Sequence, residues 1–266
     1  MFTEFKANET AWAAKTAPEI QAIAQEDGSI LIVPVGSIEQ HGDHLPVSTD
    51  TILVDAVGHA GAKAICDEIP VLVTPPVWHG YSPHHLPLGG TITLDLDGLL
   101  DVLEAIAASA MDNGFDSLLL LNGHGGNMSI VDSAIKGIGR QHPDATVHGL
   151  TYFTLATRFI DEIRDSDPGG MSHGGEFETS LMMHLQPELV QSDRMKATPK
   201  EATFDYESTD LMTGGELGTY RTFDEYSESG AIGSPELASA EKGEEILERL
   251  TTEMKSLLTQ IHEHHD

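Results

Sequence analysis

Short apolar runs alternate with stretches of helical periodicity over most of this chain, and that alternation constrains its fold more than any other feature. The runs Ser29–Val35 and Ser117–Leu121 are rich in Ile, Val or Leu and have the length of buried strands. Val71–Thr74 and Thr146–Tyr152 predict two further strands. Helices are expected over about 9–26, 50–68, 95–113, 129–140, 176–185 and 235–264. This order predicts βαβ units and a mostly parallel sheet covered by helices on both faces.

The 266 residues contain no internal repeat, no low-complexity tract and no clear linker, so we expect one domain over residues 1–266. The stretch 196–235 is polar, Gly-rich and irregular, and it is expected to form an excursion or a lid. Cys66 is the only cysteine, which excludes a disulfide framework within the chain and a thiolate metal cluster. A single cysteine also suits a reducing cytoplasm.

The charge balance is strongly acidic, with 43 Asp and Glu against 14 Lys and Arg and a formal net charge of -29. Such a surface repels nucleic acid and anionic membranes, so neither is an expected partner. The N-terminus lacks the pattern of a secretory signal, and no run of about 18 apolar residues occurs. We therefore expect a cytoplasmic protein. The Asp and Glu residues are dispersed along the chain, as in proteins from salt-loving organisms, where high salt screens the repulsion among these negative charges.

The segment after the first strand carries the first candidate metal ligands. Glu39 and His41 alternate, so their side chains point the same way in an extended chain, and Asp50 can fold back to join them. Ligands gather beyond the carboxyl ends of strands in open α/β sheets. One imidazole and two carboxylates suit Zn²⁺, Mn²⁺ or Fe²⁺, and Asp50 could bridge two ions. The alternatives are a helix N-cap at Asp50 and surface turn positions for His41 and His44.

Two later Gly-rich segments bring further candidates. Asn122-Gly-His-Gly-Gly-Asn127 follows a buried strand, and His124 is better explained as a metal ligand than as part of a phosphate-binding loop, whose usual spacings are absent. Met171-Ser-His-Gly-Gly-Glu-Phe-Glu178 precedes a short helix and supplies His173 on a flexible loop. Its two glutamates could instead be first-turn acids favoured by the helix dipole.

A fourth segment, His79–Thr91, follows the second strand and contains Ser82, His84 and His85. The four segments line one edge of the predicted sheet, and this convergence indicates a site more strongly than any single motif does. The His-rich end of the chain, His262–His265, is expected to be a solvated helix end that binds metal only adventitiously.

Together and in this order, the segments resemble the creatininase (creatinine amidohydrolase) family. The specific elements are Glu-x-His-x8-Asp, Asn-Gly-His-Gly-Gly-Asn and His-Gly-Gly-x-x-Glu-Thr, and the resemblance runs from about Leu31 to Glu244. It implies a three-layer α/β/α sandwich, a homo-oligomer with a hexamer-like ring, and a site for two divalent metal ions. By the same resemblance, one ion would be held by Glu39, Asp50 and His124, and the other by His41, Asp50 and a further carboxylate.

Two departures from the family pattern concern the site. In creatininase the further carboxylate lies two residues after the ligand histidine, where this chain has Gly126. We predict that Glu178 replaces it, with Glu176 less favoured, and that the chain belongs to the broader family without being creatininase itself. The family's Phe-Pro-Gly-Thr also appears here as Leu88-Gly-Gly-Thr91, which alters the pocket wall.

The predicted function is hydrolysis of a non-peptide C–N amide bond in a small, creatinine-like cyclic amide. Two metal ions lower the pKa of a bridging water from about 16 toward 7, and the resulting hydroxide attacks the amide carbon. His173 is expected to shuttle the proton to the leaving nitrogen, with Glu178 as the other catalytic residue. Backbone N–H groups near Gly125 and Gly126 are expected to hold the oxyanion, and Ser82 to contact the substrate.

Other functions stay open on the sequence alone. One is deformylation of a formamidopyrimidine ribonucleotide, as in flavin and deazaflavin synthesis, and another is cleavage near the C-terminus of a short peptide. A phosphate-bearing substrate would need basic residues near the site, for which the candidates are Arg158, Arg164, Arg194 and Arg221. A non-catalytic metal-binding homologue and a nucleotide-binding protein are the alternatives from other classes.

Overall fold

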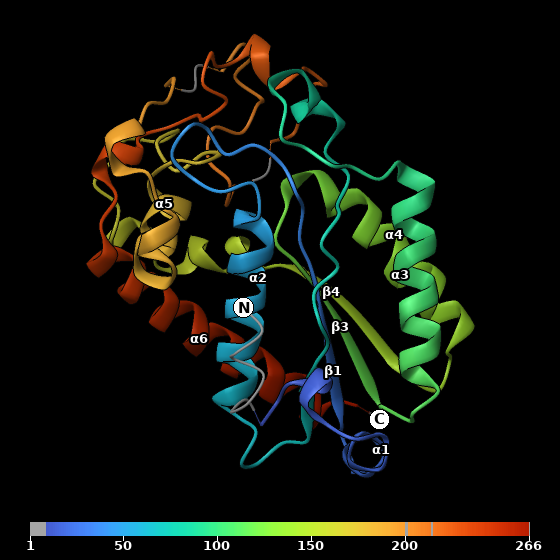
Figure 1. The fold of residues 1–266 in the computed structure, drawn as a ribbon. Coiled ribbons are helices and arrows are strands. Elements are labelled where there is room, and N and C mark those ends of the chain that lie inside the picture. The colour runs from blue at the N-terminus through green and yellow to red at the C-terminus, as the bar shows by residue number, and fades with distance from the viewer. Residues whose placement is uncertain (1–8, 200–201, 214, 266) are drawn as a thin grey trace.

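A four-stranded parallel sheet lies at the centre of the computed structural model, which describes residues 9–199, 202–213 and 215–265 (Figure 1). The spatial order is β2-β1-β3-β4. The strands are β1 (Ile30–Val35), β2 (Val71–Val73), β3 (Ser117–Asn122) and β4 (Thr146–Thr151). The first eight residues, where the sequence predicts no secretory signal, lie outside the described part of the chain.

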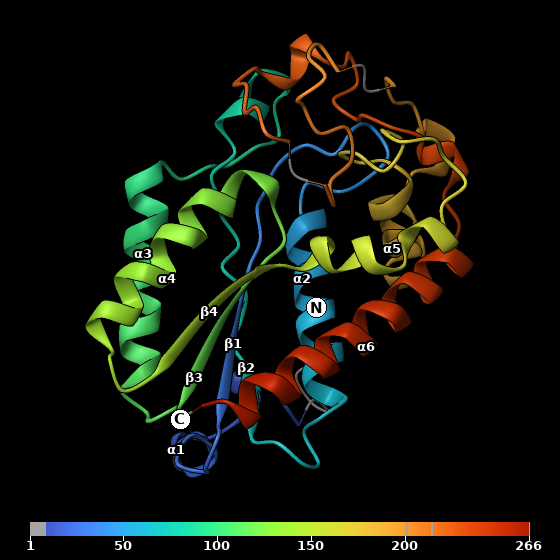
Figure 2. The same ribbon diagram turned by 180° about the vertical axis from the view of Figure 1, so that it is seen from behind.

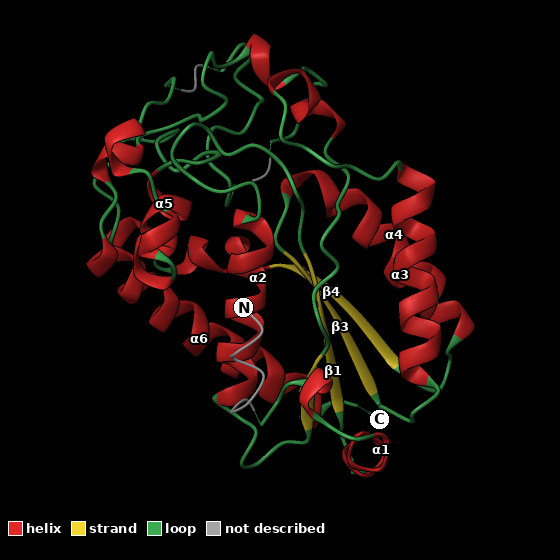
Figure 3. Cartoon of the chain, in the orientation of Figure 1, coloured by secondary structure: helices red, strands yellow, loops and turns green. Residues whose placement is uncertain are grey.

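Helices cover both faces of the sheet, which confirms the predicted α/β/α architecture (Figure 2 and Figure 3). Alternate strand residues enter opposite cores: Ile30 and Ile32 pack in one, and Leu31 and Val33 in the other. The first core is covered by α2 (Thr49–Lys63), α5 (Glu176–Leu185) and α6 (Ala240–Glu263). The second is covered by α1 (Ala17–Ala24), α3 (Leu96–Met111) and α4 (Met128–Gln141). No helix among the described residues is long and apolar enough to span a membrane.

Two expected helices begin later than the sequence pattern indicates, and local capping explains both starts. The predicted helix over 9–26 begins only after Thr16, which forms a capping box with Glu19. The C-terminal helix begins after Ser239, whose hydroxyl accepts the N–H of Lys242 at 3.2 Å. The expected start of that helix, Pro235–Leu237, is a separate 3-10 turn.

The described residues of the segment 196–235 pass over the carboxyl end of the sheet, where they appear in orange at the top of Figure 1. Its described part contains the short 3-10 turn Phe223–Glu225 and no long regular element. A bridge between Thr198 and Ile232 joins its two ends. This position above the strand ends sets the segment next to the predicted site.

Candidate metal centre

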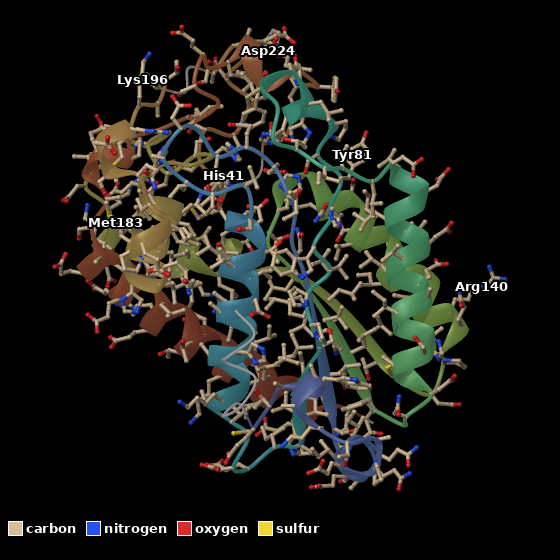
Figure 4. The ribbon with its side chains drawn as sticks, in the orientation of Figure 1. His41, Tyr81, Arg140, Met183, Lys196 and Asp224 are labelled. Carbon is tan, nitrogen blue, oxygen red and sulfur yellow. The ribbon has the colours of Figure 1, made fainter. Side chains whose placement is uncertain are left out.

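The four predicted ligands come together at the carboxyl end of the sheet, where β1 and β3 end side by side. Glu39 and His41 lie on the loop after β1, and His124 follows β3 by two residues. Asp50 lies in the first turn of α2, at the far end of the same loop. All four side chains are buried, and Figure 4 labels His41 at this end of the molecule.

The ring of His41 is oriented by the backbone. Its Nδ1 lies 3.1 Å from the Glu39 carbonyl oxygen, which can only accept, so Nδ1–H donates. Its Nε2 consequently faces Asp50 Oδ1 at 3.1 Å and Glu178 Oε1 at 3.9 Å. Burial alone would lower the pKa of His41, but the charges of Asp50 and Glu178 raise it well above its ordinary value. The three facing atoms therefore require a cation between them, either a proton or a metal ion.

His124 repeats this arrangement on the other side of Asp50. Its Nε2 lies 3.2 Å from the carbonyl oxygen of Tyr81 and donates to it. Its Nδ1 then faces Glu39 Oε2 at 3.1 Å and Asp50 Oδ2 at 3.2 Å. Against the effect of burial, these carboxylates raise the pKa of His124 to about 10. One ring nitrogen fixed by a carbonyl and the other turned to the ion is the usual geometry of metal-bound histidine.

Two carboxylate oxygens of this cluster are buried without a hydrogen-bond partner, namely Glu39 Oε1 and Asp50 Oδ2. Such atoms are costly unless a cation or donor satisfies them. Burial raises the pKa of Glu39, whereas the charges of His41 and His124 outweigh burial and lower that of Asp50. Oxygen and imidazole donors that meet in this way fit a divalent metal ion.

The two glutamates of α5 have different surroundings. Glu178 Oε2 accepts a backbone N–H at 2.7 Å while its Oε1 faces His41. Glu176 accepts two backbone N–H groups of the preceding loop, each at 3.0 Å, and forms an ion pair with Lys242. Glu178, His41 and His173 have ligand atoms that lie within 4.8 Å of one another. The geometry therefore favours Glu178 over Glu176 as the fifth ligand.

His173, on the Gly-rich loop for which the sequence predicts flexibility, is buried and held by two hydrogen bonds. Its Nε2 donates to the Gln40 carbonyl oxygen at 2.7 Å, and its own carbonyl oxygen accepts the N–H of Ile232 at 2.7 Å. Its Nδ1 is left 3.7 Å from Glu39 Oε1. Burial and the charge of His41 lower the pKa of His173 well below its ordinary value. The free nitrogen can thus accept a proton or bind an ion.

Ser82 is buried against the predicted ligands. Its hydroxyl donates to Glu39 Oε2 and lies 3.1 Å from His124 Nε2 and 2.6 Å from Ser37 Oγ. These contacts orient the carboxylate of Glu39, so the structure gives Ser82 a supporting position next to the ligands.

The two glycines after His124 differ in their space for a side chain. A Cβ at Gly125 would meet no atom within 4 Å. A Cβ at Gly126 would lie 2.3 Å from His124 Nε2 and 2.5 Å from the Tyr81 carbonyl oxygen. Glycine is therefore required at 126, and the carboxylate that the family resemblance implies for this position has no room in this chain.

Two residues beside the predicted ligands, His85 and Phe223, have no role that the sequence alone predicts. His85 places Nε2 3.2 Å from Glu39 Oε1, and its Nδ1 lies 2.7 Å from Gln40 Nε2. Burial, followed by the neighbouring imidazoles, lowers the pKa of His85 and keeps the ring neutral. The ring of Phe223 stacks on that of His85, with centroids 3.9 Å apart. His85 belongs to the segment His79–Thr91 that the sequence places at the site, whereas Phe223 lies in the irregular segment 196–235, where no periodicity points to it.

The remaining candidates lie elsewhere or have structural partners. The alternative of a surface position for His44 is wrong, because its buried Nε2 lies 3.0 Å from Thr179 Oγ1. His262 and His265 contact residues 27 and 28 before β1, at the opposite end of the sheet. Arg158 and Arg164 form ion pairs, with Glu253 and Asp210 respectively.

A family model described as creatininase, creatinine amidohydrolase, matches residues 13–258. The chain is 31% identical to the creatinine amidohydrolase of Pseudomonas putida over 252 residues, 88% of this chain and 90% of that protein. It is 30% identical to the mycofactocin precursor peptide peptidase of Mycobacterium ulcerans, over 85% of this chain and 83% of that one. It is 29% identical to the 3-dehydro-scyllo-inosose hydrolase of Thermotoga maritima, over 88% and 78%.

Solved structures resemble this fold over nearly its whole length. A crystal structure of creatinine amidohydrolase has a TM-score of 0.81 and 29% identity, covering 94% of this chain and 97% of that one. A Zn–Zn form of a creatininase variant and a Mn form of creatininase also have TM-scores of 0.81, at 28% and 27% identity, and each covers 94% of this chain and 97% or 98% of its own. These neighbours and the cluster of donor residues support divalent metal binding at this end of the sheet.

Proposed function

Because this chain belongs to the creatininase family, whose members are metal-dependent hydrolases, we propose that it hydrolyses a non-peptide C–N amide bond in a small, creatinine-like cyclic amide. One observation carries the proposal. His41 and His124 each donate one ring N–H to a backbone carbonyl and turn the other nitrogen to two buried carboxylates. Buried acceptors that face one another need a cation between them, and a divalent metal ion would meet that need at both histidines.

The donors divide into two sets that share Asp50. Glu39, Asp50 and His124 would hold one divalent ion, and His41, Asp50 and Glu178 the other. Zinc and manganese are favoured by the forms in which related creatininases were solved, and Fe²⁺ is compatible with the same donors. When bound, the ions polarise the amide carbonyl and lower the pKa of a coordinated water.

His173 and the loop after His124 supply the rest of the chemistry. With Nε2–H fixed on the Gln40 carbonyl, His173 offers Nδ1 on the side of Glu39, where it would accept a proton from the attacking water and pass it to the leaving nitrogen. The backbone N–H groups of Gly125 and Gly126 follow His124 directly and would hold the developing oxyanion.

A short peptide is the second candidate substrate. It is favoured by the 30% identity to a mycofactocin precursor peptide peptidase over 85% of the chain. A formamidopyrimidine ribonucleotide is the third. Of the arginines considered for a phosphate group, Arg221 lies two residues before Phe223, with its guanidinium 5.7 Å from the ring of Tyr226.

Metal analysis of the purified protein, followed by a turnover screen, tests the proposal. The panel holds creatinine, small cyclic amides, a formamidopyrimidine nucleotide and short peptides. We expect two ions per chain and turnover of a cyclic amide, and we expect His173→Ala to keep both ions while losing turnover. Turnover of peptides alone would replace the cyclic-amide assignment, and a protein without bound metal or any hydrolytic activity would overturn it.

A further inference from the structure

Four aromatic rings form a continuous wall beside the proposed metal ligands, here called the aromatic wall: His84, His85, His173 and Phe223. His85 is its centre, with ring centroids 4.4 Å from His84, 4.6 Å from His173 and 3.9 Å from Phe223. Phe223 also contacts His173 at 4.7 Å and His84 at 5.5 Å. The wall thus joins the element Pro83–Leu88 to the segment 196–235.

The wall flanks the proposed reaction centre on two sides. His85 and His173 both face Glu39 Oε1, at 3.2 and 3.7 Å. His84 stacks on His124 with the ring planes only 12° apart. A substrate bound at these donors would therefore have flat aromatic surfaces beside it, and Phe223 is the one carbon-only ring of the wall.

Phe223 is held in place by the segment that carries it. Thr222 and Glu225 form a capping box around the turn that begins at Phe223. Further along, the carbonyl oxygen of Gly230 accepts from Gln40 Nε2 at 3.2 Å, and the N–H of Ile232 donates to the His173 carbonyl at 2.7 Å. The segment is therefore bonded to the residues around the donors, while the ring of Phe223 stays partly exposed.

We propose that Phe223 is a specificity-determining residue, which selects substrates carrying a planar, conjugated group next to the amide that is hydrolysed. Aromatic rings attract flat unsaturated groups more strongly than saturated rings of equal size, because stacking adds to the burial of apolar area. The proposal rests on the proposed function, since it assumes that an amide binds at these donors. It adds the chemical class of the group beside that amide.

Equilibrium binding to the zinc-loaded full chain tests this role without relying on turnover. The probes are formanilide and N-cyclohexylformamide, which share the formamide and differ in having a flat or a puckered ring. The proteins are the wild type, Phe223→Leu, Phe223→Tyr and the control Phe204→Leu, which changes an exposed aromatic residue of the same segment. Metal content and thermal unfolding of each variant are measured alongside.

We expect the wild type to bind formanilide more tightly, and Phe223→Leu to weaken that probe alone by about 3- to 10-fold. Phe223→Tyr and Phe204→Leu should stay within about twofold of the wild type. Equal weakening of both probes, unchanged binding in Phe223→Leu, or no preference in the wild type would overturn the inference. Absence of turnover with clear formanilide selectivity would instead count against the proposed hydrolysis alone.

Discussion

Neutralising either of the two glutamates of α5 should have a different consequence: Glu178→Gln should lose metal, and Glu176→Gln should lose stability. Glu178→Gln keeps the shape of the side chain but removes the charge that faces His41 Nε2 at 3.9 Å. Removing a residue that only hydrogen-bonds a metal ligand lowers the metal affinity by about 10- to 100-fold. Removing the charge of a ligand itself should therefore lower the affinity for one of the two ions by at least about 100-fold. The ion held by Glu39 and His124 should remain, giving one tightly bound ion per chain.

Glu176→Gln should leave the metal content unchanged and lower stability. Glu176 accepts two backbone N–H groups at 3.0 Å and pairs with Lys242, and its carboxylate is fully buried. Hydrogen bonds to charged groups contribute about 1.5–3 kcal/mol each, but the amide keeps part of them. Lys242 also retains Asp165 at 2.7 Å. We therefore expect the free energy of unfolding to fall by about 2–3 kcal/mol.

Elemental analysis after dialysis against a weak chelator measures the ions, and urea unfolding of the metal-free proteins measures the stability. The matched pair makes the result interpretable, because both changes remove one negative charge from the same helix. Loss of metal from Glu176→Gln, or two tightly bound ions in Glu178→Gln, would refute the ligand assignment.

Three further predictions follow from the same geometry. Burial lowers the pKa of His44 to about 4, so on acidification this histidine is protonated in the unfolded chain before it is protonated in the folded one. The free energy of unfolding should therefore fall by about 2 kcal/mol between pH 7 and 5. Urea unfolding of His44→Gln at the two pH values should lack this loss. Gly126→Ala should weaken metal binding at least about tenfold in a chelator competition, because the added Cβ meets the ring of His124. Gly125→Ala is the control, since a Cβ there meets no atom within 4 Å. Equal metal affinities of the two variants would contradict the clash. With a net charge of -29, the melting temperature should rise from dilute buffer to molar potassium chloride, and a lower melting temperature in salt would disprove the predicted screening.

The strands could be predicted because the central ones are buried on both faces. β1 and β3 are buried along their whole length, so each reads as a continuous apolar run. Helix ends were less predictable, because capping decides them: Thr16 and Ser239 start helices well inside the regions that periodicity marked. Apolar periodicity reports which face is buried and says little about where the backbone hydrogen bonds begin.

The same distinction applies to the site. Glu39, His41 and His124 follow buried strands directly, so their meeting is a consequence of parallel strand order that sequence can anticipate. The contact between His85 and Phe223 joins residues 138 positions apart through an irregular segment. No local pattern encodes that pairing. The hydrogen bond from the N–H of Ile232 to the His173 carbonyl is equally hidden from local patterns, since Ile232 comes from the same distant segment.

The crossing of the segment 196–235 over the strand ends also has a consequence for how this fold can change during evolution. The proposed ion donors are on the loops that follow β1 and β3 and on helices α2 and α5, whereas Phe223 arrives on a separate stretch of chain. Insertions or exchanges in that stretch can alter which substrates fit beside the donors without moving a donor atom. Relatives that match this chain over most of its length and are named for a peptide, for creatinine and for an inosose are what such independence would produce.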